Sequence, residues 1–273
     1  MSERLQRVLN NLRQSKTKAL SVFTMAGYPT PEATLEIVPL LARAGVDFVE
    51  LGIPFSDPIA DGPIIQAAAH RALQHGTTLH RVLQMIEQLR RQTDIPLLLM
   101  GYANPVWQFG LEPFAETCRR LQVDGIILPD LPLEEYRPYQ NLFQATDLDV
   151  IHLIAPNTPE HRIRTIDRHS TAFIYCTTHT GVTGRNPRSS ARMTAFFSQL
   201  SNWVTHPVMI GFGVKSHRDF VYYSQFADGV IVGSAFLQFL QSLKPDDYPS
   251  AIPRFVRAIR HADPEGMEPK TPR

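Results

Sequence analysis

The chain has 273 residues, of which 43% are hydrophobic and 19% are charged, and its formal net charge is +1. This composition is close to that of an average soluble globular protein, which excludes a disordered tail or linker protein. The near-zero net charge provides no basic surface for nucleic acid or an anionic membrane. The length fits one or two ordinary domains, or one parallel α/β barrel of about 250 residues.

Cysteine and histidine usage indicates no metal site. Cys118 and Cys176 are too few for a disulfide scaffold and lack metal-site spacing, so both are expected to be buried thiols in a reducing compartment. His70, His75 and His80 recur every five residues, which does not place two ligands on one helix face. The N-terminal sequence lacks a signal-peptide core, and the apolar runs are shorter than the roughly 18 residues of a membrane span. A cytoplasmic protein is therefore expected.

Short apolar runs alternate with amphipathic segments along the whole chain. Eight runs are continuously apolar, as strands covered on both faces should be. These predicted strands are Leu20–Met25, Phe48–Gly52, Leu97–Gly101, Gly125–Pro129, Val150–Ile154, Phe173–Thr177, Val208–Gly211 and Gly229–Gly233.

Segments with helical periodicity separate the strands. The predicted helices are Pro31–Ala44, Leu79–Gln92, Glu112–Leu121, Glu134–Ala145, Pro159–Arg168, Ser190–Trp203, Arg218–Gln225 and Ser250–His261. A further helix over Glu3–Arg13 precedes the first strand and is expected to cover the floor of a barrel. A short helix is expected to begin at Ser234.

The repeated strand–helix order is typical of right-handed βαβ units and predicts a single-domain (β/α)8 TIM barrel with an extra N-terminal helix. The barrel is expected to span residues 1–262, with a disordered tail over residues 263–273. A doubly wound sheet is the main alternative, but it would place a glycine fingerprint after its first strand, where this chain has Ala26-Gly27-Tyr28-Pro29. Glycines gather instead after the last three strands, where barrels commonly bind phosphate.

The segment from Glu50 to Pro63 carries two candidate acid–base residues. Glu50 closes the second predicted strand, where a barrel presents side chains to its active-site end. Asp61 follows in a loop long enough to fold back over the barrel mouth. Apolar neighbours are expected to raise the carboxyl pKa, which lets the group act as acid and then as base near neutral pH. The structural alternatives are a buried salt bridge for Glu50, and a helix cap or turn for Asp57 and Asp61.

Three glycine-containing segments follow the sixth, seventh and eighth predicted strands. Their backbone N–H groups could approach an anion closely, and a helix beginning at Ser234 would attract negative charge. Together they predict a phosphate cup formed by Gly181-Val182-Thr183-Gly184, Gly211-Phe212-Gly213 and Gly233-Ser234.

Apolar and aromatic side chains at other strand ends could line a slot for a flat apolar group; they are Phe23, Leu99, Tyr102, Tyr175 and Phe212. Leu99 and Phe23 could equally be barrel core, whereas the tyrosine hydroxyls need partners and fit the barrel mouth better. These features predict a small phosphorylated substrate with an apolar part, handled by carboxyl groups without a metal or a cofactor in this chain.

The segment Glu50-Leu51-Gly52-Ile53-Pro54-Phe55-Ser56-Asp57-Pro58-Ile59-Ala60-Asp61-Gly62-Pro63 resembles the signature of the tryptophan synthase α-subunit family. Further matches follow in order across the chain, except in its last dozen residues. The resemblance implies a single-domain barrel that cleaves indole-3-glycerol phosphate into indole and glyceraldehyde 3-phosphate. It also implies a partner, a pyridoxal-phosphate β subunit that receives the indole through a tunnel in an αββα heterotetramer.

The resemblance also implies a role for each matching residue. Glu50 matches the general acid–base residue that protonates indole C3 and then removes the glycerol hydroxyl proton, and Asp61 matches the carboxylate that holds the indole N–H. Asp57 matches a loop that faces the β subunit. The remaining matches surround the indole and glycerol (Phe23, Leu99, Tyr102, Tyr175) or the phosphate (Thr183, Gly184, Phe212, Gly213, Gly233, Ser234).

The chain departs from the family pattern after the sixth strand. Many members have Ser-Arg where this chain has Thr178-His179, in a lid loop that closes over substrate and contacts the β subunit. Histidine has a shorter reach than arginine, so the isolated chain is predicted to close poorly and to need its partner. Alternatively, Arg185 or Arg188 closes the lid and the chain is a free-standing lyase. An enzyme for another phosphorylated molecule and a non-catalytic activating subunit are the remaining alternatives.

Overall fold

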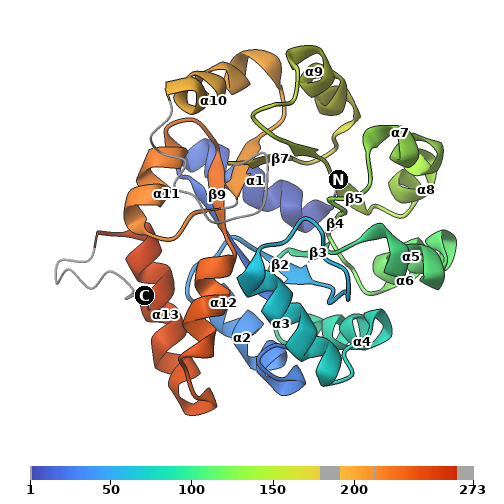
Figure 1. Ribbon diagram of the computed structural model, residues 1–273, viewed down its shortest axis with the longest axis vertical. Coiled ribbons are helices and arrows are strands. Elements are labelled where there is room, and N and C mark those ends of the chain that lie inside the picture. Colours follow the sequence, from blue (N-terminus) through green and yellow to red (C-terminus); the bar gives the residue numbers. More distant parts are fainter. Residues whose placement is uncertain (1, 179–190, 212, 263–273) are drawn as a thin grey trace.

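Parallel strands form the centre of the molecule in the computed structural model, which describes residues 2–178, 191–211 and 213–262 (Figure 1). Within these residues a single nine-stranded sheet has the order β5-β4-β3-β2-β1-β9-β8-β7-β6. The strands are β1 (Ala19–Met25), β2 (Phe48–Gly52), β3 (Leu97–Met100), β4 (Gly125–Ile127), β5 (Asp149–Ile151), β6 (Leu153–Ile154), β7 (Ile174–Thr177), β8 (Val208–Gly211) and β9 (Gly229–Val232).

The two edges of this sheet, β5 and β6, are consecutive in the chain and are separated by His152 alone. The chain itself therefore joins the edges and closes the barrel. The predicted barrel fold is confirmed, but the fifth predicted strand is divided into β5, which pairs with β4, and β6, which pairs with β7.

Helices surround the strands (Figure 1). They are α1 (Glu3–Ser15), α2 (Pro31–Arg43), α3 (Pro63–Gln74), α4 (Leu79–Arg90), α5 (Ala103–Phe109), α6 (Leu111–Arg120), α7 (Leu133–Tyr136), η1 (Arg137–Tyr139), α8 (Gln140–Ala145), α9 (Glu160–His169), α10 (Ala191–Trp203), α11 (His217–Ser224), α12 (Ser234–Gln241), η3 (Pro245–Asp247) and α13 (Tyr248–Arg260).

Local sequence signals set several helix boundaries. Thr30 caps α2 by accepting a hydrogen bond from the backbone N–H of Ala33, and Pro31 occupies the first turn, where its missing N–H is not needed. Ser216 and Asp219 form a reciprocal capping box at the start of α11. These caps satisfy backbone N–H groups that the first turn of each helix would otherwise leave unpaired.

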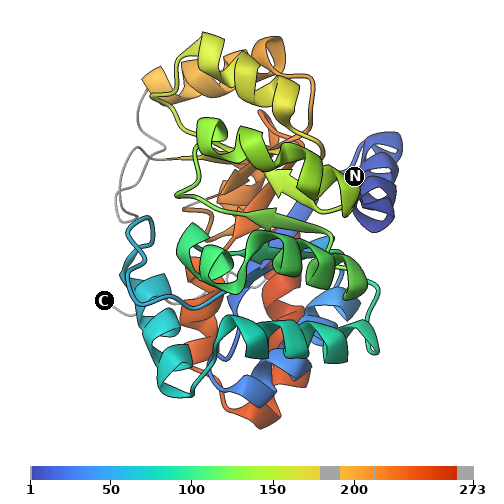
Figure 2. The ribbon, with the colours of Figure 1, turned by 90° about the vertical axis from the view of Figure 1, so that its right-hand side faces the viewer.

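Helix α1 closes the floor of the barrel. The backbone N–H of Ser2 donates to Asp149 Oδ2 at 2.9 Å, and the Ser2 hydroxyl donates to Asp124 Oδ1 at 2.5 Å. Asp124 immediately precedes β4 and Asp149 begins β5, so both acceptors lie at strand N-termini. Figure 2 shows α1 at one end of the barrel and the loop between β2 and α3 at the opposite end, where the strands finish.

Two helices have no counterpart among the predicted elements. The buried face of α3 is Ile65, Ala68, Ala69 and Ala72, in which alanine contrasts only weakly with the polar face. Helix α5 has seven residues, too few to establish a helical period. The predicted tail lies outside the described residues. No described helix is long and apolar enough to cross a membrane.

Candidate active site

Strand register decides which side chains of β2 face the barrel interior. Glu50 pairs with Phe23 on β1 and with Leu98 on β3, and paired residues in parallel strands point to the same face. Leu51 points to the opposite face, and Leu99 is its register partner. Leu99 therefore lies on the helix-facing side, which agrees with its alternative interpretation as core and not with its predicted place in the slot.

The carboxyl group of Glu50 is enclosed, and the residue has 0% exposure. The Ser21 hydroxyl donates to Glu50 Oε1 at 3.2 Å, whereas Oε2 has no hydrogen-bond partner among the described residues. Burial raises the pKa of Glu50 to about 8, although the hydrogen bond from Ser21 acts in the opposite direction. The part of the chain that is described contains no ion pair of Glu50, so the salt-bridge interpretation finds no support.

Asp61 lies in the loop between β2 and α3 and is 8% exposed. The Tyr102 hydroxyl donates to Asp61 Oδ2 at 3.0 Å and accepts from the backbone N–H of Ala60, also at 3.0 Å. The Phe55 ring stacks on Tyr102 with centroids 5.3 Å apart. Burial raises the pKa of Asp61 to about 6, and the Tyr102 hydrogen bond lowers it. These contacts hold the loop against the barrel mouth, as the sequence predicted.

The helix-cap interpretation of the acidic loop residues is wrong. Helix α3 has Gly62 as its N-cap residue and no side-chain cap. Asp57 is exposed, and its Oδ2 accepts a 2.5 Å hydrogen bond from the Ser56 hydroxyl. Asp57 therefore stands at the surface of the loop, while Asp61 is turned inward.

Tyr175, on β7, lies close enough to the acidic pair to be influenced by it. Burial, followed by the charges of Glu50 and Asp61, raises the pKa of its phenol well above the usual value. A Cβ atom added to Gly211 would lie 2.1 Å from the Tyr175 hydroxyl oxygen. Glycine at position 211 thus provides the space that the Tyr175 side chain occupies.

Phe23 and Met100 form apolar surface on the face of the sheet that carries Glu50. A Cβ atom added to Gly52 would lie 2.7 Å from Phe23 Cζ, so the Phe23 ring reaches across Gly52. Gly52 pairs with Met100, which places Met100 on this same face. The sequence reasoning missed Met100. Side chains alternate between the two faces along β3, so Leu98, the partner of Glu50, and Met100 share a face. This alternation would have selected Met100 in place of Leu99.

The glycines predicted to bind phosphate lie at the ends of β8 and β9. Gly213 has φ = 105°, a conformation that glycine adopts without strain. Gly233 separates β9 from α12, and Ser234 is the first residue of that helix. The backbone N–H groups of Phe236 and Leu237 donate to the Gly233 carbonyl, so the N–H groups of Ser234 and Ala235 are the ones that an anion at this helix start would meet. The predicted residues Thr183, Gly184 and Phe212 lie outside the described residues.

The predicted lid and partner residues are only partly described. Thr178 is buried directly after β7, and His179 lies outside the described residues. The described parts of the chain contain no group of three or more His, Cys, Asp or Glu side chains that could hold a metal ion.

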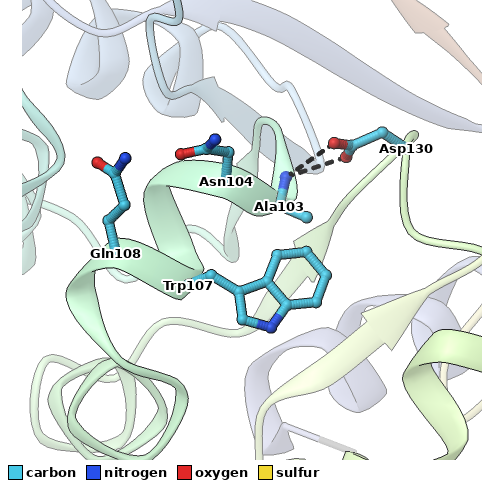
Figure 3. Close-up of a pocket in the computed structure, with 5 residues that line it drawn as sticks. All are labelled: Ala103, Asn104, Trp107, Gln108 and Asp130. Carbon is cyan, nitrogen blue, oxygen red and sulfur yellow. Dashed lines mark hydrogen bonds between the residues drawn. The ribbon is translucent and has the colours of Figure 1, made fainter.

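A shallow pocket of about 450 Å³ lies beside Tyr102 at the start of α5. Figure 3 shows that the backbone N–H of Ala103 points at the Asp130 carboxylate, which accepts from it at 3.0 and 3.2 Å. Trp107, which also lines the pocket, is 43% exposed, and Ile59 in the acidic loop is 78% exposed. Large apolar side chains are therefore presented to solvent at the active-site end of the barrel.

Known proteins resemble the chain over nearly its whole length. The model of the family described as "Tryptophan synthase alpha chain" matches residues 9–259. The tryptophan synthase alpha chain of Phocaeicola vulgatus is 39% identical over 256 residues, which cover 93% of this chain and 99% of the relative. The crystal structure of tryptophan synthase subunit alpha from Legionella pneumophila has a TM-score of 0.86 at 34% identity and covers 95% of this chain and 97% of that chain.

A structure of the tryptophan synthase complex from Pyrococcus furiosus also matches, with a TM-score of 0.80 at 29% identity. It covers 88% of this chain and 97% of that chain. The range matched by the family model contains the strands of the barrel and both Glu50 and Asp61. The chain therefore belongs to the tryptophan synthase alpha chain family.

Proposed function

We propose that this chain is a lyase that cleaves indole-3-glycerol phosphate into indole and glyceraldehyde 3-phosphate, for the biosynthesis of tryptophan. The observation that carries the proposal is a pair of enclosed carboxyl groups, that of Glu50 on β2 and that of Asp61 in the loop after this strand. Burial raises the pKa of Glu50 to about 8 and that of Asp61 to about 6. Near neutral pH the first is largely protonated and the second largely ionised, which assigns an acid and an anion to one site.

In the proposed reaction Glu50 donates its proton to C3 of the indole ring, and Asp61 accepts a hydrogen bond from the ring N–H. The positive charge that develops on the ring is stabilised by the Asp61 carboxylate, a form of differential transition-state stabilisation. The Glu50 carboxylate then takes the proton of the adjacent glycerol hydroxyl. The carbon–carbon bond breaks, its electron pair returns to the ring, and an aldehyde forms while Glu50 regains its proton.

Three further groups of residues are assigned to the substrate. Phe23 and Met100 contact the apolar ring, and Tyr102 and Tyr175 line the mouth of the site. Gly213, Gly233 and Ser234 bind the phosphate, together with Thr183, Gly184 and Phe212 from outside the described residues. Glycine lets the backbone approach an anion closely, and a helix start attracts negative charge, so both features suit a phosphate at these strand ends.

The proposed proton transfers use this chain's own carboxyl groups and call for no cofactor in it. The partner in the proposal is a pyridoxal-phosphate β subunit in an αββα complex. The relative from Pyrococcus furiosus has been solved as a tryptophan synthase complex, which supports this assignment. The exposed residues Asp57, Ile59 and Trp107 are proposed to contact the partner, with Thr178 and His179 in the lid. A cytoplasmic location stays a prediction from the sequence.

Release of indole from indole-3-glycerol phosphate tests the function directly, with the isolated chain and with a tryptophan synthase β subunit added. Indole release that depends on Glu50 is the expected result. The absence of indole in both conditions would contradict the proposal. Activation of the β subunit without any indole release would instead support a non-catalytic subunit.

A further inference from the structure

Ser21 is a polar residue in the middle of the apolar strand β1. All seven residues of this strand are buried, and Ser21 has 0% exposure. A buried hydroxyl costs free energy unless it forms a hydrogen bond. The partner of this hydroxyl is Glu50 Oε1, at 3.2 Å on the neighbouring strand. A serine at this position therefore interacts with the acid–base residue and adds little to the apolar core.

The hydrogen bond makes the two oxygens of Glu50 chemically different. Oε1 accepts from Ser21, and Oε2 has no partner among the described residues although it is buried. When Glu50 is protonated, its carbonyl oxygen is a better acceptor than its hydroxyl oxygen, so the hydrogen bond from Ser21 to Oε1 favours the proton on Oε2. When Glu50 is ionised, the same contact stabilises the carboxylate. One hydroxyl thus serves both protonation states.

We propose that Ser21 is a positioning residue that anchors Glu50 through Oε1 and reserves Oε2 as the atom that exchanges protons with the substrate. The inference rests on the proposed function, because it assigns a reacting atom to Glu50. Ser21 itself touches no reacting atom in this arrangement. It acts by fixing the side-chain orientation and by favouring the ionised form of Glu50.

Among the described residues, Ser21 is the hydrogen-bond donor to the Glu50 carboxyl group. On β3 the register neighbour is Leu98, and on β1 it is Phe23, neither of which titrates. In the described part of the chain, Tyr175 on β7 is a titratable group close to Glu50, since its pKa is raised by burial and by the charges of Glu50 and Asp61. Burial disfavours the ionised form of Glu50, whereas the Ser21 hydroxyl favours it.

Three substitutions of Ser21 isolate the effect of its hydroxyl, and a fourth substitution, at Glu50, is the reference. Ser21→Ala removes the hydroxyl, while Ser21→Thr and Ser21→Val form a pair of nearly equal shape in which only threonine keeps it. Loss of the hydrogen bond is expected to raise the pKa of Glu50, so the alkaline limb of kcat/KM should move up by about one pH unit in the Ala and Val variants. The Thr variant should keep the original limb. The fourth, Glu50→Gln, is the reference without a titrating group at position 50.

A direct titration makes the test independent of turnover. The infrared carbonyl stretch of protonated Glu50, identified by its loss in Glu50→Gln, should disappear at higher pH in Ser21→Ala and Ser21→Val than in the unmodified chain. A change in melting temperature without a shift of this band would show a purely structural role and overturn the proposal. An equal shift in Ser21→Thr would overturn it as well.

Failure of the proposed function is distinguishable from failure of this inference. If the unmodified chain releases no indole, the proposed reaction is wrong, but the infrared titration still reports on the contact between Ser21 and Glu50. If indole is released and the Ala and Val variants have unchanged pH profiles and band positions, the reaction stands and the role of Ser21 is refuted.

Discussion

At the scale of single residues, two carboxyl groups titrate on either side of neutral pH. The proposed reaction requires ionised Asp61 and protonated Glu50 in the free enzyme. With pKa values of about 6 and about 8, kcat/KM should follow a bell-shaped pH profile whose acid limb belongs to Asp61 and whose alkaline limb belongs to Glu50. Initial rates at low substrate concentration, measured across this range, check the prediction.

The substrate phosphate complicates the acid limb, because phosphate monoesters also titrate at about pH 6. Asp61→Asn is the matched control, since asparagine keeps the shape and cannot ionise. The pH profile of kcat/KM for the residual activity of this variant should no longer show the acid limb. An unchanged limb would assign it to the substrate and leave the proposed role of Asp61 without kinetic support.

Glu50→Gln should have opposite effects on activity and stability. Glutamine keeps the shape but cannot transfer the proton, so kcat should fall by about 10²–10⁴-fold with a much smaller change in KM. The folded-state pKa of Glu50 is raised above that of the unfolded chain. Its protonated form therefore favours folding below the unfolded value, and this contribution is lost as pH rises through about 8.

Denaturant unfolding of both proteins from below pH 4.5, the ordinary pKa of a glutamate side chain, to above about pH 8 measures the second effect. The free energy of unfolding of the unmodified chain should fall, relative to Glu50→Gln, by an amount on the order of a few kcal/mol at alkaline pH. Because Asp61 titrates in both proteins, the difference isolates Glu50. Parallel pH dependences would show that Glu50 is not held in a desolvated site.

At the scale of secondary-structure elements, the turn after β8 allows a matched test of the phosphate cup. Gly213 has φ = 105°, which asparagine and aspartate tolerate better than most residues. Gly213→Asp adds a negative charge, and Gly213→Asn adds nearly the same shape without it. KM should be at least about tenfold higher in the Asp variant, a difference of about 1.4 kcal/mol. Equal KM values would remove this turn from the phosphate site.

The division of the fifth strand predicts acid sensitivity. His152, between β5 and β6, is buried with its Nε2 unpartnered among the described residues and packs on Tyr136 at 4.8 Å between ring centroids. Burial, aided by the charge of His169, lowers the pKa of His152 to about 4. Its contribution to stability should decline as pH falls from about 6.5 to about 4, by up to about 3 kcal/mol, because the unfolded chain binds the proton more readily.

Unfolding of His152→Leu over the same pH range checks this assignment. Leucine fills similar space and cannot titrate, so the variant should lose less stability on acidification than the unmodified chain. Identical acid dependence in both proteins would place the sensitivity in other groups. The carboxyl groups are common to both and cancel in the comparison.

Elements with a strong apolar signal could be predicted from the sequence, and weaker ones could not. Strand β8 was predicted with the bounds that the structure shows, because four residues covered on both faces form one apolar run. The break at His152 left no such signal, since the residues on both sides remain buried. The register between β2 and β3 decides which side chains of β3 share a face with Glu50. Register is a long-range property that a single sequence does not reveal, so the sequence reasoning selected Leu99 instead of Met100.

At the scale of the whole molecule, fold and family followed from the order of the elements and one loop motif, whereas the state of the lid could not be predicted. Replacement of Ser-Arg by Thr178-His179 predicts a chain that needs a partner, but closure depends on contacts outside a single chain. Addition of a β subunit should raise indole turnover by about 5–150-fold, a coupling of about 1–3 kcal/mol. High turnover of the isolated chain with no increase on addition would support a free-standing lyase.

Surface variants locate that coupling on the molecule. Ile59→Asp should weaken activation by the β subunit because it places a charge on an exposed apolar side chain, while the basal rate of the isolated chain should stay within about twofold. Val221→Asp is the matched control, since Val221 is also exposed but belongs to α11. Equal effects of the two variants on activation would argue against docking through the acidic loop.

The passage from β5 to β6 also determines how the two halves of the site are connected. Glu50 and Asp61 precede this passage in the chain, and Tyr175, Gly213 and Ser234 follow it. On one side of the barrel the two halves share the β1–β9 hydrogen-bond ladder. On the other side the continuous segment 149–154 joins them, because β5 pairs with β4, β6 pairs with β7, and the His152 carbonyl accepts from the backbone N–H of Tyr175 at 3.0 Å. The acid–base half and the phosphate half of the site are therefore carried by one uninterrupted wall of strands, which fixes the distance that a substrate must span between them.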